Sequence, residues 1–332
     1  MSHLHNRRIA VLGLGMENLS LLKFLFQQQV ECEVVVCDIR PEKEMKKKLN
    51  ELSGYMYRNK AVKVELNLGA GYDDHLEEYD IIMRSPGYPL FSRNLVRAVT
   101  RNKKKDPTRK LIITSPIKLF FDLSPTRNIV GVTGTKGKGT TAALITHILN
   151  RAGRRAFLGG NIGIPPFDFI HQLKEKDWVI LELSSFQLED IHKSPRIAVF
   201  TNFYKDHMTA ADTNNPNYHK RLKDYWEAKL NIIRHQRPKD KAVVNERFKL
   251  FVTSYKIPSQ LIFFSPSDLK TKLFGEHNRE NIGAAEEVAR TVNIKRKTVR
   301  EAVKNFSGLE HRLEFVKQDR DRVKYFNDSF AT

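Results

Sequence analysis

The chain has 332 residues, of which 40% are hydrophobic, and a formal net charge of +19. This length is enough for two or three domains with cores of ordinary size. No stretch of the sequence is both long and apolar enough to cross a bilayer, and the polar start MSHLHNRR leads into a strand-like run instead of the apolar core of a signal peptide. We therefore expect a cytoplasmic protein that does not associate with membranes.

Lysine and arginine are distributed along the whole chain, with short runs only at 46–48 and 103–105. No pattern of stacking aromatics accompanies these runs, so we expect no specific nucleic-acid partner, whereas anionic small substrates would be attracted. The two cysteines, Cys32 and Cys37, lie five residues apart in one predicted strand, where they cannot readily pair. We expect both to be reduced core residues.

The first predicted elements follow a strand-loop-helix pattern. A strand over 7–13 leads into Gly13-Leu14-Gly15 and a helix, and a second strand ends at Asp38, where a dinucleotide fold would place the acid that holds a ribose. Asn18 occupies the position of the third glycine of that pattern. The residues alone leave two interpretations open, a nucleotide site and a tight turn between strand and helix.

The same sheet is predicted to continue to residue 114. A strand within 79–89 ends in the loop 85–87, and another strand covers 111–114. We expect 115–128 to be a connection, and we place the first domain boundary near Thr114.

The most informative stretch is 129–141, IVGVTGTKGKGTT, where an apolar strand gives way to a glycine-rich loop and then to a helix. Glycines let successive N–H groups face an anion, the helix N-terminus adds partial positive charge, and Lys138 can reach the outer phosphates of a triphosphate. The general phosphate-loop pattern is imperfect, because Val132 replaces its first glycine and Gly139 replaces the Ser or Thr that binds Mg²⁺. Thr140 is the nearest replacement.

Apolar strands then alternate with helices, which is typical of a mostly parallel α/β sheet. Ligands of such sheets bind at the carboxyl ends of the strands. Polar residues gather after these predicted strands, at Asn161, Glu182, Ser184 and 202–207.

A helix over 277–292 places Asn278 and Asn281 on one face. Asn278 could equally be a helix cap. Beyond Gly308 the sequence has two further strand-like runs, LEFV and VKYF, which we expect to lack partners and to be locally disordered.

Motifs along the whole chain resemble, in order, those of the Mur ligases: GVTGTKGKGTT, GGNIG, LELSSFQLE, TNFYKDHM, YWEAKLNI, HNREN, GLEHRLE and FNDSFAT. The string LELSSFQLE looks most like the members that add D-glutamate to UDP-N-acetylmuramoyl-L-alanine. The resemblance implies an ATP- and Mg²⁺-dependent amide ligase that works through an acyl phosphate in peptidoglycan precursor synthesis. We expect a monomer.

The resemblance also implies an α/β fold of three domains. These are a Rossmann-like UDP-sugar domain over 1–114, a central P-loop-type ATPase domain with a mostly parallel sheet over 115–307, and the start of a truncated C-terminal α/β domain over 308–332. A third domain of this family would continue for roughly another hundred residues, which is a normal domain length. We therefore expect an incomplete copy that binds both nucleotides but does not form the amide.

The family's functional residues carry over position by position. Those implied for ATP are Gly134, Thr135, Gly137, Lys138, Gly139, Thr140, Thr141, Asn278, Asn281, Arg312 and Asp328. Those implied for the UDP-sugar are Asp38, Arg40, Ser85, Asn161, Ser184 and Gln187. Catalysis is assigned to Lys138, Glu182, His207 and Lys229, and two Mg²⁺ sites to Thr140, Glu182, His207 and Lys229, of which Lys229 is carbamylated in the family.

Two alternatives stay open at this point. The spacing of Lys138, Gly139 and Thr140 looks like that of folylpolyglutamate synthases, so another ligase of the superfamily fits the loop. A nucleotide-dependent oxidoreductase or binding module would rest on Gly13, Gly15 and Asp38, but the phosphate loop argues against it.

Overall fold

The computed structural model describes residues 4–105, 111–211, 213–318 and 322–329. The chain forms two compact units. The first unit comprises Met1–Ser124, Pro165–Gln172 and His207–Tyr225, and the second comprises Pro125–Ile164, Leu173–Asp206 and Trp226–Thr332. After Ser124 the chain therefore returns to the first unit twice, at Pro165–Gln172 and at His207–Tyr225.

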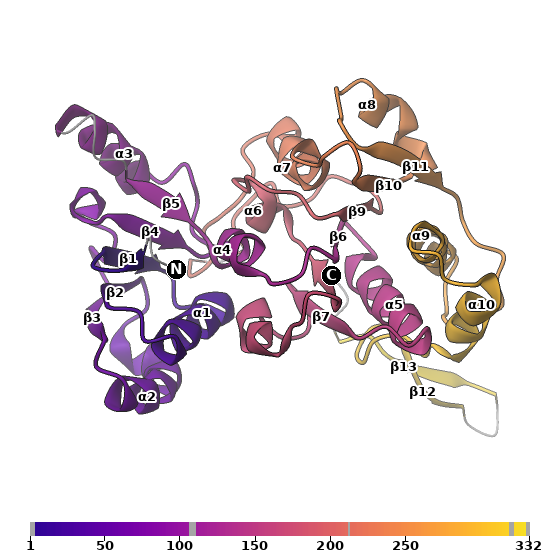
Figure 1. Ribbon diagram of the computed structural model, residues 1–332, viewed down its shortest axis with the longest axis horizontal. Helices are drawn as coiled ribbons and strands as arrows, with labels where there is room; N and C mark the ends of the chain where they lie inside the picture. Colours follow the sequence, from indigo (N-terminus) through magenta and orange to yellow (C-terminus); the bar gives the residue numbers. More distant parts are fainter. Residues whose placement is uncertain (1–3, 106–110, 212, 319–321, 330–332) are drawn as a thin grey trace. The chain divides into compact units, whose positions relative to one another are not determined.

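The first unit is built on a five-stranded parallel sheet with the order β3-β2-β1-β4-β5 (Figure 1). Its strands are β1 (Arg8–Leu12), β2 (Cys32–Asp38), β3 (Val62–Leu68), β4 (Ile81–Arg84) and β5 (Ile112–Thr114). Its helices are α1 (Met16–Gln27), α2 (Glu42–Arg58), α3 (Arg93–Lys105) and α4 (Pro116–Leu123). Parallel strands covered by helices on both faces read as continuous apolar runs, which is why β1 and β4 are almost wholly buried.

The second unit is built on a six-stranded sheet with the order β11-β10-β9-β6-β8-β7, again entirely parallel. Its strands are β6 (Ile129–Thr133), β7 (Ala156–Gly160), β8 (Trp178–Glu182), β9 (Ile197–Phe200), β10 (Lys241–Asn245) and β11 (Gln260–Phe264). Its helices are α5 (Lys138–Arg151), α6 (Ser185–Leu188), α8 (Lys249–Thr253), α9 (His277–Thr291) and α10 (Arg296–Asn305), while α7 (Leu222–Arg234) begins in the first unit and ends in the second.

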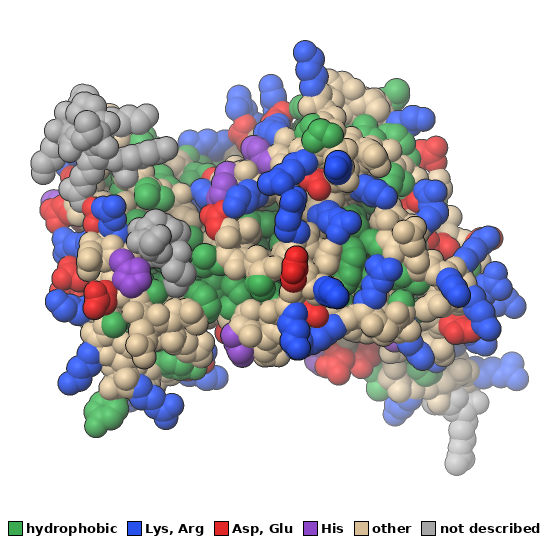
Figure 2. Space-filling view, viewed as in Figure 1, with side chains coloured by type: hydrophobic (Ala, Val, Ile, Leu, Met, Phe, Trp, Pro, Cys, Tyr) green, Lys and Arg blue, Asp and Glu red, His purple; other side chains and the backbone are tan. Residues whose placement is uncertain are grey.

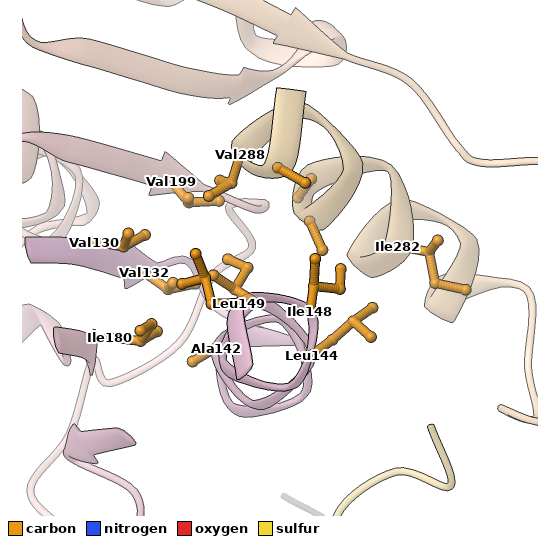
Figure 3. Packing of buried hydrophobic residues seen from close by; sticks show 14 of the residues in the cluster. Val130, Val132, Ala142, Leu144, Ile148, Leu149, Ile180, Val199, Ile282 and Val288 are labelled. Atoms are coloured by element: carbon orange, nitrogen blue, oxygen red, sulfur yellow. The ribbon is translucent and has the colours of Figure 1, made fainter. Parts of the chain in front are cut away.

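The core of the second unit joins this sheet to helices α5 and α9. Val130 and Val132 of β6 point toward Leu149 of α5, and Val199 of β9 lies near Val288 of α9 (Figure 3). These side chains are almost completely buried, and truncating one of the larger ones to alanine would cost roughly 2–5 kcal/mol of stability. Helix α5, which follows the phosphate loop, therefore packs both on the sheet and on α9.

The predicted α/β class with parallel sheets is confirmed, but one predicted connection is wrong. Segment 115–128 contains helix α4, whose N-cap Ser115 accepts a hydrogen bond from the backbone N–H of Lys118 at 3.4 Å, with Pro116 in the first turn. Ile117 and Phe120 bury their side chains on one face. A Ser-Pro start followed by apolar residues three apart is a helix signal, although the prolines that flank the segment are also typical of a loop.

The strands expected to lack partners pair with each other. β12 (Glu314–Gln318) and β13 (Lys324–Asn327) form an antiparallel two-stranded sheet. Phe315 and Phe326 pack against one another and against Phe274. The ring centroid of Phe326 lies 5.8 Å from that of Phe315 and 4.7 Å from that of Phe274. The predicted division into three domains, with 308–332 as the start of the third, stays a prediction.

Cys32 and Cys37 are buried and unpaired, as predicted. Basic side chains lie scattered over the visible surface with acidic side chains between them (Figure 2). Of the helices in the described part of the chain, none has the length and apolar character needed to span a bilayer.

Candidate active site

The loop between β6 and α5 has a backbone that requires its glycines. Gly134 and Gly137 have φ angles of 152° and 77°. A Cβ on Gly134 would collide with the hydroxyl of Thr201, and one on Gly137 would collide with the amide oxygen of Asn281. Gly137 is the N-cap of α5, so the unpaired N–H groups of the first helical turn open from this loop.

The end of β9 holds the loop in place. The backbone N–H of Thr135 donates to the carbonyl of Asn202 at 3.0 Å, and the backbone N–H of Lys136 donates to its side-chain oxygen at 2.8 Å. Asn202 also donates from its amide nitrogen to the carbonyl of Lys136 at 3.0 Å, and Thr201 donates to the same carbonyl at 2.9 Å. β9 and β6 are neighbours in the sheet, which is why residues 66 positions apart meet. The sequence analysis noted polar residues at 202–207 but assigned no role to Asn202.

The first turn of α9 contacts the loop from the other side. The hydroxyl of Thr141 donates to Asn281 at 3.2 Å, and Asn281 donates to Asn278 at 2.8 Å. The two asparagines therefore share one face, as predicted. Because α9 begins at His277 with Glu276 as its N-cap, the alternative interpretation of Asn278 as a cap is wrong.

Glu182 is the last residue of β8 and is only 3% exposed. Its Oε1 accepts a hydrogen bond from the side chain of Asn161 at 2.9 Å, whereas its buried Oε2 has no hydrogen-bond partner among the described residues. Lys138 donates from Nζ to the carbonyl of Thr135 at 3.0 Å. Burial lowers the pKa of Lys138, and the negative charge of Glu182 partly opposes that shift. Burying a carboxylate with one unbonded oxygen lowers the stability of the fold unless a cation binds that oxygen.

These residues fit a Mg²⁺ ion. Mg²⁺ in nucleotide sites is usually held by one or two carboxylates together with phosphate oxygens and water, and Oε2 of Glu182 is a free acceptor of that kind. Thr140 lines the adjoining pocket, while the hydroxyl of Thr141 is engaged by Asn281. In the described part of the chain no three His, Cys, Asp or Glu side chains gather into a ready-made metal site.

Lys229, on α7, is 1% exposed and donates from Nζ to the carbonyl of Gly134 at 2.7 Å. Burial lowers the pKa of this amine well below its usual value, and the positive charge of Lys138 lowers it further. His207 belongs to the first unit and has a φ angle of 56°. Its ring lies 5.7 Å from that of Tyr225 in an edge-on arrangement.

A pocket of about 690 Å³ opens beside the loop, a size typical of small-molecule sites. Six of the residues predicted for ATP line it: Gly137, Thr140, Asn278, Asn281, Arg312 and Asp328. The other lining residues were not predicted from the sequence: Lys136, Asn202, Tyr204, Arg247, Pro266, Glu276, His277, Glu280 and Leu313. Asn202 and Tyr204 fall in the stretch 202–207 that follows a predicted strand, whereas the other residues come from separate elements and carry no such signal.

In the first unit, Asp38 is fully engaged at the end of β2. Its carboxylate accepts from the backbone N–H of Leu14 at 2.7 Å and from the guanidinium of Arg40 at 2.6 and 2.8 Å. The pKa of Asp38 is lowered although burial alone would raise it, because hydrogen bonds from Arg40 and Leu14 outweigh that effect. Lys48 also reaches this loop and donates to the carbonyl of Leu14 at 2.7 Å. Asp38 therefore positions Arg40 against the glycine loop.

The remaining predicted sugar residues lie in two places. Ser85 faces Gly13, since a Cβ on Gly13 would stand 2.5 Å from its hydroxyl oxygen. Ser184 and Gln187 form a capping box at the start of α6: Gln187 Oε1 accepts from Ser184 N at 2.8 Å, and Ser184 Oγ accepts from Gln187 N at 3.2 Å. Both side chains thus have a structural task in this conformation.

Comparison with protein-family models matches 132–268 to the Mur ligase middle domain and 7–104 to the N-terminal domain of MurD-like Mur ligases. A UDP-N-acetylmuramoylalanine–D-glutamate ligase of Clostridium tetani is 34% identical over 99% of this chain and 71% of its own length. The corresponding enzyme of Acetivibrio thermocellus is 31% identical over 98% of this chain and 70% of its own length.

Solved structures give the same fold at lower identity. A UDP-N-acetylmuramate:L-alanyl-γ-D-glutamyl-meso-diaminopimelate ligase from Neisseria meningitides has a TM-score of 0.59 at 18% identity, covering 92% of this chain and 99% of its own. UDP-N-acetylmuramate–alanine ligase from Thermotoga maritima has a TM-score of 0.52 at 20% identity, covering 97% of this chain and 74% of its own.

Proposed function

Because this chain belongs to the Mur ligase family, we propose that it joins D-glutamate to UDP-N-acetylmuramoyl-L-alanine in an ATP-dependent reaction. The observation that carries the proposal is the buried carboxylate of Glu182, with one unpaired oxygen beside a lysine-containing phosphate loop. It is supported by relatives of that name, at 31–34% identity over nearly the whole chain. We place the protein in the cytoplasm as a monomer.

The phosphate loop would bind the triphosphate of ATP. Gly134 and Gly137 allow the backbone to approach phosphates closely, and Lys138 would add a positive charge at the outer phosphate. Asn278 and Asn281 would contact the nucleoside from α9, and Arg312 and Asp328 line the same pocket. In this arrangement the substrate carboxylate would attack the γ-phosphate and release ADP, which gives an acyl phosphate. The amine of D-glutamate would then attack the acyl carbon, release inorganic phosphate and lose a proton to give the amide.

Mg²⁺, when bound, would neutralise charge on the phosphates and so allow a carboxylate to approach them. Oε2 of Glu182 and the hydroxyl of Thr140 are the groups proposed to hold it. Asn161 would orient Glu182 by donating to its other oxygen. For a second Mg²⁺ we propose Lys229 as a ligand from the second unit; His207, the other ligand that the resemblance implies, belongs to the first unit. The burial that lowers the pKa of Lys229 favours a neutral amine, which is the form that reacts with carbon dioxide to give a carbamate.

The UDP-sugar would bind at the first unit. Arg40 is held by Asp38 against the loop Gly13-Leu14-Gly15, so a guanidinium lies at this loop for an anionic nucleotide. The backbone N–H groups of Gly13 and Leu14 are already bonded, to the carbonyl of Cys37 and to Asp38. Ser85 lies beside the same loop. For Ser184 and Gln187, sugar contacts would have to form at the edge of the α6 capping box.

A thermal-shift comparison tests the proposal. UDP-N-acetylmuramoyl-L-alanine, dihydrofolate and NAD are added separately, each in the presence and absence of ATP and Mg²⁺. A ligand at 100 times its Kd stabilises the folded state by about 2.7 kcal/mol. We therefore expect the UDP-sugar, and ATP with Mg²⁺, each to raise the melting temperature by several degrees. Stabilisation by dihydrofolate instead would favour a folylpolyglutamate synthase-like ligase, and stabilisation by NAD alone would exclude a ligase of either kind.

A further inference from the structure

A second pocket lies in the second unit at the amino ends of its strands. It has a volume of about 290 Å³ and is lined by the start of β8, β9 and β10 and by the end of α9: Arg154, Trp178, Arg196, Ile197, Lys239, Lys241, Thr291, Val292 and Asn293. All strands of this sheet run parallel, so their amino ends gather at the edge opposite to the phosphate loop. The pocket is therefore separate from the candidate active site.

Four of its lining residues are cationic, and none is acidic: Arg154, Arg196, Lys239 and Lys241. Within the described ranges, no carboxylate forms a salt bridge with any of the four. Two acids adjoin lining residues in sequence, Asp177 before Trp178 and Asp240 between Lys239 and Lys241, and both have other partners. Asp177 accepts from Arg155 at 3.3 Å and from the backbone of Lys174 at 2.9 Å, and Asp240 accepts from the backbone of Arg237 at 2.7 Å.

Three of the cations are held in place by neutral groups. Arg154 donates to the carbonyl of Val292 at 2.5 Å and lies over the ring of Trp178, 5.7 Å from its centroid. Arg196 donates to the side-chain oxygen of Asn128 at 2.5 Å. Lys241 donates to the carbonyl of Thr291 at 3.3 Å. Their charges are thus oriented but not neutralised.

A purely structural explanation accounts for half of this cluster. Arg154 and Lys241 contact the last carbonyls of α9, and basic side chains at a helix C-terminus are stabilising. Arg196 and Lys239 are exposed, and in the described part of the chain neither donates a hydrogen bond to that helix end. Two further positive charges at the same pocket add repulsion without satisfying the helix, and an anion would remove that repulsion.

We infer that this pocket binds a small oxyanion of two or more negative charges, such as a pyrophosphate or a phosphorylated metabolite. Guanidinium groups offer paired N–H donors that match phosphate oxygens, and lysine ammonium groups add point charge. The volume is near the lower end for small-molecule sites, which suits a compact anion. The inference does not depend on the ligase assignment.

The test uses inorganic pyrophosphate as the probe and the full chain carrying Lys138→Ala, which weakens binding at the phosphate loop. Calorimetry at constant ionic strength compares this protein with a version that also carries Arg196→Gln and Lys239→Gln. The matched control carries Lys297→Gln and Lys304→Gln instead, two exposed residues of α10 that do not line the pocket. Both versions lose two positive charges from the same unit.

We expect the pocket variant to raise the Kd for pyrophosphate at least tenfold and the α10 control to change it less than twofold. The melting temperature without anion should stay equal or rise in the pocket variant, because the repulsion that is removed outweighs the loss of the exposed hydrogen bond from Arg196 to Asn128. Equal weakening in both variants, or no binding by the Lys138→Ala protein at millimolar pyrophosphate, would overturn the inference. A lower melting temperature together with unchanged affinity would instead establish a structural role only.

Discussion

Oε2 of Glu182 lies 2.8 Å from the point where a Cβ on Gly139 would stand. Ile162 approaches the same point to 2.9 Å, so position 139 has no room for a side chain while the carboxylate keeps this orientation. The usual Ser or Thr after the phosphate-loop lysine is therefore excluded by a residue on the neighbouring strand of the sheet. The glycine and the carboxylate have to be considered together.

Gly139→Ser tests this relationship. The new side chain would displace the carboxylate of Glu182, so we expect Mg²⁺-dependent ATP binding to weaken about tenfold or more, measured by calorimetry with and without Mg²⁺. Gly54→Ser is the matched control, because a Cβ at Gly54, in α2, meets no atom within 4 Å. Unchanged binding by Gly139→Ser would show that Glu182 has room to move and does not restrict the loop.

Lys138→Ala should weaken ATP binding by roughly 1.5–3 kcal/mol, the range of a lost charge-assisted hydrogen bond, or about 10- to 150-fold in Kd. The exposed Lys304→Ala provides the control for lost charge. Calorimetry giving the same ATP affinity for wild type and Lys138→Ala would disprove the assignment of the loop.

Thr140 and Thr141 can be separated by their surroundings. Thr140→Val should reduce the Mg²⁺ dependence of ATP binding, because Thr140 is the hydroxyl that lines the pocket. Thr141→Val should instead lower stability by about 1 kcal/mol, since it removes a buried hydrogen bond to Asn281. Calorimetry and thermal unfolding distinguish the two effects. The reverse pattern would place the metal ligand one residue later.

Lys229 should make stability rise with pH. Its folded pKa lies well below the ordinary value of 10.5, so between these two pKa values the unfolded chain binds more protons than the folded chain. Stability therefore increases as pH rises through that window, by up to about 1.4 kcal/mol per pH unit for one proton. Lys229→Met should lose this increase in carbon dioxide-free buffer.

Unfolding by urea at several pH values up to about 9 measures the difference between wild type and Lys229→Met. Subtracting the two profiles removes the contributions of Cys32 and Cys37, which act in the opposite direction because their pKa values are raised. Lys223→Met, an exposed change on the same helix, should keep the wild-type slope. Identical profiles for wild type and Lys229→Met would contradict a shifted amine.

The sequence predicted what depends on local pattern. The strand-loop-helix at 129–141, the strand ending at Asp38 and the shared face of Asn278 and Asn281 all follow from spacing and residue type, and the structure places them as expected. Each requires only a few adjacent residues, because glycine conformations and apolar runs act locally.

Contacts between distant segments could not be predicted in the same way. The support of the loop by Asn202 depends on β9 pairing with β6, and the collision at Gly139 depends on β8 pairing on the other side. Strand order depends on the packing of the whole sheet, so the local sequence around Asn202 or Gly139 does not reveal which strands are neighbours. The capping box of Ser184 and Gln187 was present in the sequence as a Ser-x-x-Gln pattern, but the same residues were assigned to sugar binding.

The two native thiols offer a practical advantage for studying movement between the units. Burial raises the pKa of Cys32 to about 11 and that of Cys37 to about 12, so neither forms much thiolate near neutral pH. Maleimide dyes react with thiolates, so they should leave both residues unmodified in the folded protein. A single cysteine introduced on the surface of each unit could then carry a fluorophore pair without removal of the natural cysteines. Energy transfer in solution would report the separation of the two units with and without nucleotide.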